Sequence, residues 1–282
     1  IPAFIGLIVL TYIPLIAVFG LSFFKWGGTG APEWNGINNY IKLFTTDPYF
    51  KESIKVTVYF SLLAVVGSMV YSLIVAMLLN RKIPARGFFR AVFYLPYVLP
   101  AAAVYIGWSW LYNTEWGLFN YILSKLGIER LMFVSSSSQV VPSLALIAVW
   151  LSGNLIVIFL AGLQNVPRVY HEAAEIDGAN AWQRFWHVTF PSMTPIIFYN
   201  MLMSLITNMQ VVTPALALTK GGPGKSSYFM SYMLYNYAFK QRGKIGLACA
   251  IAFVLFLLIG AFTLLLFATS KSWIFYEGGD DK

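Results

Sequence analysis

Residues 171–191 read HEAAEIDGANAWQRFWHVTFP, and this segment decides how the rest of the chain is interpreted. It contains Glu, Asp, Arg and His, whereas long uncharged apolar runs lie on both sides of it. Residues 172–175 are good helix formers, and Gly178 is a natural helix stop. A second short helix is expected from Ala181 to about His187. A polar helix between two apolar runs is either a docking element for another protein or a plain surface helix between spans, and the residues alone leave both interpretations open.

The composition places the chain among membrane proteins. Of its 282 residues, 59% are hydrophobic and only 11% are charged. Ordinary soluble domains carry about 25% charged residues. The formal net charge is +8, but no basic helix and no basic patch interleaved with aromatic residues is present. The sequence therefore predicts a polytopic membrane protein and argues against nucleic-acid binding.

Six uncharged runs are long enough to cross a bilayer, which takes about 20 apolar residues as a helix. Backbone groups find no water in lipid, so the runs are expected to be helices. We predict an all-α fold with one transmembrane domain over residues 1–282 and a cytoplasmic loop over 165–190. The chain starts inside an apolar run, so a further tail is expected upstream. The six predicted spans are about 1–24, 56–80, 91–113, 140–164, 191–218 and 245–270.

The orientation follows from the short loop 81–90, RKIPARGFFR, which has four basic residues and no acid. Such density is typical of cytoplasmic loops. Because the runs alternate in direction, segment 171–191 is predicted to lie on the same side. The longer segments on the opposite side contain more Lys and Arg in total. We give the short loop more weight, because the positive-inside rule applies to short loops.

The predicted spans have no Asp, Glu, Lys, Arg or His in their interiors. This argues against proton-coupled carriers and against channels with charged rings. A sodium site built from carbonyl groups alone remains open. Cys249 is the single cysteine, and His171 and His187 are isolated, so neither a disulfide nor a metal site is expected. No catalytic residue is predicted.

One stretch resembles a phosphate-binding loop without fulfilling its requirements. Residues 219–227 read TKGGPGKSS, but Thr219 occupies the position where that motif needs its first Gly. The motif also requires a preceding strand, and an apolar span precedes this stretch. We therefore expect no ATP site in this chain. Either another chain supplies the energy, or transport is passive.

The fifth run carries polar side chains at helical spacing. Ser204 and Asn208 are four residues apart, and Thr207 and Val211 flank the same helix face. Asn154 is a similar candidate on the fourth run. Two interpretations remain open: these side chains hydrogen-bond neighbouring helices, or they line a pocket for a polyhydroxylated solute. Because no charged cluster accompanies them, an uncharged solute such as a sugar fits better than an anion.

The polar segment also resembles a known family. Its residues 172–174, Gly178 and Pro191 match the pattern EAA, three residues, Gly, nine residues, I-x-L-P of the membrane subunits of bacterial binding-protein-dependent ABC importers. Val188 and Phe190 replace the Ile and Leu. The chain also resembles the carbohydrate branch of this family, which includes the maltose and glycerol-3-phosphate permeases. The motifs that carry this resemblance are AGLQ at 161–164 with Pro167, Asp177-Gly178-Ala179, Gly36-x-x-Asn39-Tyr40, Phe88-Phe89-Arg90, Thr219 with Gly221-Gly222-Pro223, and Tyr237-Ala238-Phe239. Ser226-Ser227 departs from the Thr that is common there.

The resemblance implies a type I importer in the bacterial cytoplasmic membrane. Its expected partners are a second permease in a heterodimer, two cytoplasmic ATPases that bind ATP and Mg²⁺, an extracytoplasmic solute-binding protein, and a sugar. This chain itself would hold no cofactor. The residues expected to couple to an ATPase are Glu172, Ala173, Ala174, Asp177 and Gly178. An outer-loop site is expected at Gly221, Gly222 and Pro223.

The family's sugar contacts fall on the span after the coupling loop, which favours Ser204, Thr207, Asn208 and Val211. The main alternative is a glycerol-3-phosphate-type permease. A secondary carrier or facilitator would work without any ATPase. A receptor or assembly scaffold would transport nothing.

Overall fold

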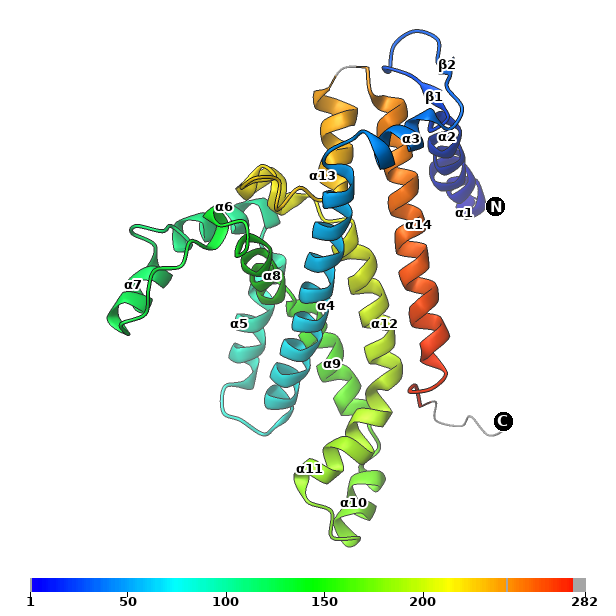
Figure 1. The fold of residues 1–282 in the computed structure, drawn as a ribbon. Coiled ribbons are helices and arrows are strands. Elements are labelled where there is room, and N and C mark those ends of the chain that lie inside the picture. Colours follow the sequence, from blue (N-terminus) through cyan, green and yellow to red (C-terminus); the bar gives the residue numbers. More distant parts are fainter. Residues whose placement is uncertain (1, 242, 276–282) are drawn as a thin grey trace.

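The computed structural model describes residues 2–241 and 243–275, and this part of the chain is mostly helical (Figure 1). Residues 1, 242 and 276–282, which the predicted domain includes, lie outside it. The α-helices are α1 Pro2–Leu7, α2 Ile13–Leu21, α3 Asn38–Thr45, α4 Phe50–Asn80, α5 Arg86–Val98, α6 Ala101–Leu111, α7 Leu118–Lys125, α8 Val140–Trp150, α9 Gly153–Asn165, α10 Arg168–Ile176, α11 Ala181–Arg184, α12 Phe190–Met209, α13 Met230–Tyr235 and α14 Ile245–Ser270. The remaining elements are the π-helices η1 Ile8–Tyr12, η3 Phe185–Thr189, η4 Ala215–Thr219 and η5 Asn236–Lys240, the 3₁₀-helix η2 Phe133–Ser135, and the paired strands β1 Phe24–Lys25 and β2 Glu33–Trp34.

Helix α4 forms the centre of the bundle. It is 31 residues long and packs against α8, α9 and α12. Small buried serines, Ser68 and Ser72 among them, allow its neighbours to approach closely. The Ser72 hydroxyl lies 2.9 Å from that of Ser152, between α8 and α9. This contact fixes the middle of α4 against a bend in the neighbouring helix pair.

Two of the predicted spans are bent rather than straight. The run predicted over 91–113 is divided into α5 and α6, which meet at an angle of 100°. Pro100 supplies no N–H, and it holds Leu99 in an extended conformation with ψ 144°. The run over 140–164 is bent by 50° between α8 and α9. Here a Cβ on Gly153 would lie 2.7 Å from the carbonyl oxygen of Phe93, so only glycine permits the close packing of α9 on α5.

Within the described residues, three helical stretches can cross a membrane by length and composition, and the number rises to five if each bent pair forms one span. These membrane-crossing helices confirm the prediction of an all-α fold with several spans. The predicted helix over 191–218 is wrong at its end, because α12 stops at Met209 and η4 follows from Ala215. Pro214 before η4 lacks the N–H that a continuous helix would need. Helix α14 has the predicted bounds of 245–270.

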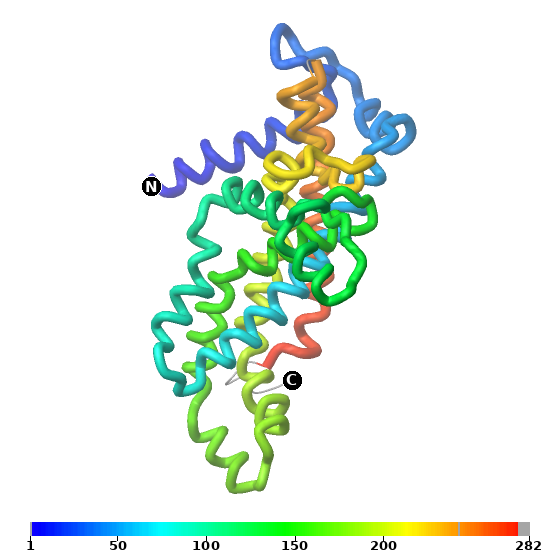
Figure 2. Tube along the Cα trace, turned by 90° about the vertical axis from the view of Figure 1, so that its left-hand side faces the viewer, coloured from blue at the N-terminus to red at the C-terminus, as the bar shows by residue number. Residues whose placement is uncertain are grey.

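Elements outside the bundle lie at its two ends, and α7 projects from one side of it (Figure 1). Helix α3, the β1–β2 pair and α13 lie at one end. Helices α10 and α11 extend from the other end, where the loop between α4 and α5 also lies. The stretch from α1 to α2 leans away from the bundle (Figure 2), and none of its helical residues is buried.

Candidate functional site

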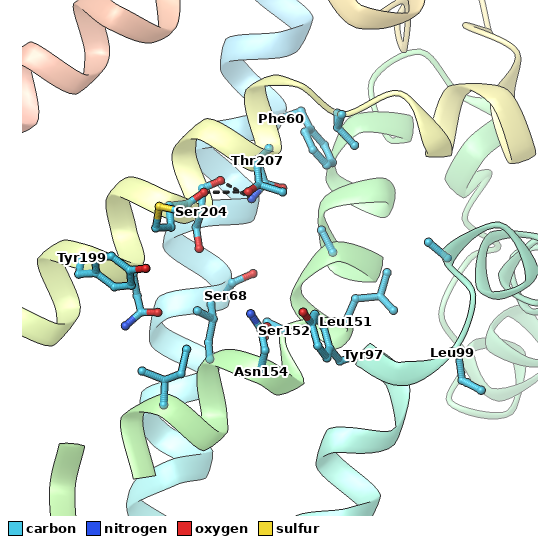
Figure 3. A pocket seen from close by; sticks show the side chains of 18 of the residues that line it. Phe60, Ser68, Tyr97, Leu99, Leu151, Ser152, Asn154, Tyr199, Ser204 and Thr207 are labelled. Atoms are coloured by element: carbon cyan, nitrogen blue, oxygen red, sulfur yellow. Dashed lines mark hydrogen bonds between the residues drawn. The ribbon is translucent and has the colours of Figure 1, made fainter. Parts of the chain in front are cut away.

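A cavity of about 510 Å³ lies where the bent helices meet α12 (Figure 3). Its walls come from α4, α5, α6, α8, α9 and α12. Ligand sites commonly enclose about 300–1,000 Å³ and lie between the helices of bundles. Both bends contribute to this cavity, because Leu99 and Ser152 at the two breaks are among its lining residues.

The five residues predicted for the substrate pathway all line this one cavity. Asn154 comes from α9, and Ser204, Thr207 and Asn208 come from α12. Val211 lies just beyond the end of α12, where its N–H donates to the Asn208 carbonyl at 3.3 Å. The fold thus brings together positions that are far apart in the sequence. Their contact with a solute stays a prediction.

The polar groups on α12 are already oriented by their own helix. The Asn208 side-chain nitrogen donates to the Ser204 carbonyl at 2.8 Å, and the Thr207 hydroxyl donates to the Met203 carbonyl at 2.9 Å. Asn200, which also lines the cavity, makes the same bond to Ile196 at 2.8 Å. Within the part of the chain that the structure describes, the side-chain oxygens of Asn200 and Asn208 accept no protein hydrogen bond. They are available to hydroxyl donors of a solute.

Several lining residues were not identified from the sequence. Asn200 lies four residues before Ser204, so extending the same helical spacing by one turn would have found it. Tyr97 and Tyr199 expose 49% and 58% of their surface, and their rings can stack on apolar faces of a solute. Ser68 on α4 carried no signal in the sequence, because only tertiary packing brings it to this wall.

The cavity is lined entirely by uncharged side chains. Hydroxyl, amide and phenol groups supply its polarity, and apolar side chains complete the walls. Among the described residues, no group of three His, Cys, Asp or Glu side chains comes together as a metal site. The cavity can therefore hydrogen-bond a neutral, hydroxyl-rich molecule and has no cation with which to neutralise a phosphate.

The predicted coupling segment is a helix that ends in a tight glycine turn. Helix α10 covers residues 168–176, and Gly178 follows it with φ +80°. The Gly178 N–H donates to the Glu175 carbonyl, and the Ala179 N–H donates to the Ala174 carbonyl at 2.9 Å. This pair of bonds is the Schellman motif, which requires a left-handed residue at this position. The next helix, α11, starts with a reciprocal capping box between Asn180 and Gln183.

The surface of this segment is open and partly apolar. Ile176 is 88% exposed and Trp182 is 69% exposed. A groove of about 260 Å³ lies between the end of α10 and the stretch from α11 to η3, and an ion pair between Glu175 and Arg184 connects α10 to α11. Large apolar side chains this exposed are typical of an interaction surface. The structure leaves Glu172, Ala173, Asp177 and Gly178 exposed and Ala174 half-buried, and their role in coupling stays a prediction.

The predicted outer loop, residues 219–227, packs against aromatic side chains of the molecule. Gly221 has φ +82°, and a Cβ there would lie 2.6 Å from the ring of Tyr228. Gly222 and Pro223 are joined by a cis peptide bond. The Lys225 ammonium lies 4.4 Å from the centre of the Tyr228 ring, and burial raises the pKa of that tyrosine. The predicted outer-loop site at residues 221–223 is therefore an ordered turn, and no observation assigns it a ligand.

Comparison with known proteins identifies the family. The family described as "Binding-protein-dependent transport system inner membrane component" matches residues 68–272, which include the cavity wall formed by α9 and α12 and the whole coupling segment. The chain belongs to this family. It is therefore a multi-pass permease of the cytoplasmic membrane, as predicted from the sequence.

Curated relatives cover nearly the whole chain. A probable ABC transporter permease protein, YesP of Bacillus subtilis, is 36% identical over 99% of this chain and 91% of its own length. The multiple sugar-binding transport system permease protein MsmF of Streptococcus mutans is 36% identical over 94% of this chain and 91% of its own. The trehalose/maltose transport system permease protein MalF of Thermococcus litoralis is 29% identical over 93% of this chain and 89% of its own length.

A solved structure shares the fold. A chain of a bacterial ABC transporter involved in the import of the acidic polysaccharide alginate superposes with a TM-score of 0.79, covering 96% of this chain and 93% of that one. The two sequences are 20% identical, so the similarity establishes the helical architecture alone.

Proposed function

We propose that this chain is the permease subunit of an ATP-driven importer of neutral sugars or oligosaccharides and forms half of the translocation pathway. The observation that carries the proposal is the uncharged cavity, with its amide and hydroxyl groups on one wall and exposed tyrosine rings beside them. Sugars present hydroxyl groups at their edges and apolar faces between them, so this combination suits them. The printed names of two relatives, which concern multiple sugars and trehalose or maltose, support the same class.

The alternatives have less support. A glycerol-3-phosphate-type permease would need to compensate a phosphate, and the cavity lining contains no Lys or Arg. A secondary carrier or facilitator would need no coupling surface, and the exposed apolar side chains of α10 and α11 beyond the bundle support the importer instead. A receptor or scaffold that transports nothing would not need the cavity.

The backbone offers a direct connection between the coupling surface and the cavity. Residues 181–209 are helical without a break, because α11 continues through the π-helix η3 into α12. At about 1.5 Å per residue, these residues form a rod of about 43 Å. A displacement of the cytoplasmic end would therefore move Ser204 and Asn208 at the cavity. In this proposal, two cytoplasmic ATPases bind ATP and Mg²⁺ and move that end.

The proposal includes two further partners. A second permease would supply the remaining cavity wall in a heterodimer, and the unburied stretch from α1 to α2 leaves apolar surface for protein or lipid. A solute-binding protein would deliver the sugar to the end of the molecule that carries α3 and α13. The family description, which names binding-protein-dependent transport, supports this partner.

The test is uptake by cells in which this chain is the sole permease of its kind. Radiolabelled neutral disaccharides serve as probes, with glycerol 3-phosphate as the anionic comparison. Thr207→Val and Asn208→Ala should each lower disaccharide uptake about tenfold, because each removes a hydrogen-bonding group from the cavity. Thr269→Val is the matched control, since the Thr269 hydroxyl makes the same backbone bond on α14, to the Leu265 carbonyl, away from the cavity.

Membrane levels of each variant are measured alongside uptake. Normal disaccharide uptake by both cavity variants would contradict the cavity assignment. Equal losses in Thr207→Val and Thr269→Val would mean that the helix bond, and not the cavity, matters. Uptake of glycerol 3-phosphate but of no disaccharide would favour the anionic alternative.

A further inference from the structure

Residues 81–90, here called the loop 81–90, comprise the turn between α4 and α5 and the start of α5, and they concentrate positive charge without any acidic residue. Arg81, Lys82, Arg86 and Arg90 lie within ten residues that contain no acid. Each ion pair within the described residues, 2–241 and 243–275, involves other basic side chains. A cluster like this gains free energy by binding an anion from outside the chain.

Arg86 is the residue that points to a specific ligand. Its Nε and Nη2 atoms are buried and have no hydrogen-bond partner among the described residues. These nitrogens form one edge of the guanidinium group, which suits two oxygens of a phosphate. Buried charged donors without an acceptor are costly, so a phosphate that displaced the atoms covering this edge would relieve that cost.

The position of the loop indicates where the phosphate comes from. In Figure 1 the loop lies at the same end of the bundle as the last turn of α14, and α10 and α11 extend further. The loop therefore lies at the level of the membrane surface, where lipid phosphates are found. Phe88 and Phe89 beside it are 65% and 41% exposed, and their rings make an edge-to-face contact with centroids 5.7 Å apart.

We propose that the loop 81–90 binds the headgroup phosphate of one anionic phospholipid, such as phosphatidylglycerol, in the cytoplasmic leaflet. Arg86 holds the phosphate, Arg81, Lys82 and Arg90 provide the surrounding positive charge, and the two phenylalanines enter the acyl region. Basic sites between membrane helices on the cytoplasmic side suit such lipids. The assignment rests on the orientation of the chain in the membrane and is independent of the transported solute.

A soluble partner is a weaker candidate for the same charge. A protein carboxylate would have to approach at the membrane surface, past two exposed phenylalanine rings. The exposed Ile176 and Trp182 offer a partner protein a more accessible surface further from the bilayer. The contrast between the two surfaces favours a lipid at the loop and a protein at α10 and α11.

The experiment is native mass spectrometry of the full chain, purified in a neutral detergent and mixed with phosphatidylglycerol or phosphatidylcholine of matched acyl chains. The wild-type chain should retain one phosphatidylglycerol about tenfold better than phosphatidylcholine. Arg86→Gln should abolish this preference, and Arg86→Lys should keep part of it. Lys271→Gln, which removes one charge from the exposed cytoplasmic end of α14, should leave it unchanged.

Four results would overturn the proposal. The first is a wild-type chain that shows no preference for phosphatidylglycerol, and the second is a folded Arg86→Gln chain that retains the preference. The third is a loss of the preference in Lys271→Gln equal to that in Arg86→Gln. The fourth is displacement of the lipid by millimolar inorganic phosphate, which would make the ligand a free anion. The wild-type comparison needs no variant to fold. If Arg86→Gln weakened binding of an ATPase and left lipid retention intact, the counter-charge would be a protein carboxylate. None of these results would alter the uptake predicted for Thr207→Val.

Discussion

Among single residues, Asn39 joins three segments at the end of the molecule that carries α3. Its side-chain nitrogen donates to the carbonyl oxygens of Ser22 at 2.7 Å and of Phe24 at 2.9 Å. These bonds attach α3 to the end of α2 and to the start of β1. Because the side chain is buried, its removal would leave both carbonyls without a partner.

We expect Asn39→Ala to lower the free energy of unfolding by about 2–3 kcal/mol, the cost of two buried hydrogen bonds and their unsatisfied acceptors. Asn38→Ala is the neighbouring control, since Asn38 makes one exposed bond to Asn35. It should change stability by less than about 0.5 kcal/mol. Thermal unfolding of the two variants in detergent measures the difference. Equal melting temperatures would contradict this role of Asn39.

The sequence indicated that Asn39 and Tyr40 belong to a family pattern. It did not predict which groups their side chains bond. The carbonyls that Asn39 bonds belong to residues 15 and 17 positions earlier. Tyr40 places its hydroxyl 2.6 Å from that of Ser22. Such partners depend on how the chain turns between α2 and α3, and no local spacing rule describes that turn.

At the scale of elements, two glycine turns have the same geometry and different surroundings. Gly178 ends α10 with φ +80°, and Gly127 ends α7 with φ +71°. Each donates its N–H to the carbonyl three residues earlier, and in each the next residue closes the Schellman motif. A Cβ would meet no atom within 4 Å at either position. Substitution there strains the backbone without causing a clash.

We expect Gly178→Val and Gly127→Val to destabilise their turns by similar amounts, about 1–2 kcal/mol. Only Gly178→Val should reduce sugar-stimulated ATP hydrolysis by the reconstituted importer, because only that turn shapes the proposed ATPase surface. Glu172→Lys, on the exposed side of α10, should have the same effect by reversing a charge. Hydrolysis at the wild-type rate in Gly178→Val and Glu172→Lys would argue against docking through α10.

The bent pairs also depend on glycine, but through packing. A Cβ on Gly153 would lie 2.7 Å from the Phe93 oxygen and 3.0 Å from the Tyr94 Cα, both backbone atoms of α5. Gly153→Ala should therefore lower the free energy of unfolding by about 1–3 kcal/mol. It should also reduce sugar uptake, because α5 carries the cavity residue Tyr97. Gly107→Ala on α6 is the control: its Cβ would meet nothing within 4 Å, so no loss of stability is expected.

Melting temperatures and uptake of the two variants test this packing. A fully stable Gly153→Ala chain with normal uptake would mean that α5 and α9 can separate without consequence. A loss of stability in Gly107→Ala equal to that in Gly153→Ala would mean that helical glycine itself, and not the approach of α5, is responsible.

The helical spacing on α12 was sufficient to select Ser204, Thr207 and Asn208, because residues four apart share a face wherever the helix lies. The bends were less predictable. Pro100 indicates a break, but the angle of 100° depends on what α6 packs against. Tyr97 and Ser68 reach the cavity only through that packing, so they could not be selected from the sequence.

Across the whole molecule, the predicted segments are assembled around α4, with α10 and α11 at one end and α3, the β1–β2 pair and α13 at the other (Figure 1). The alternation of spans predicted that the loop 81–90 and segment 171–191 share a side, and the structure has both at the same end. The polar insertion from which the family resemblance was inferred thus lies beyond the bundle. Which end faces the cytoplasm stays a prediction from charge density.

Single-cysteine labelling tests this orientation. Cys249 is the one cysteine of the chain and is buried, so Cys249→Ala gives a background without thiols. Ile176→Cys then places a thiol on the coupling surface, and Glu129→Cys places one on the exposed loop after α7 at the opposite side of the predicted membrane. A membrane-impermeant maleimide should label Glu129→Cys in intact spheroplasts and Ile176→Cys only after permeabilisation. The reverse pattern would place the loop 81–90 and segment 171–191 outside, and with them the proposed lipid and ATPase sites.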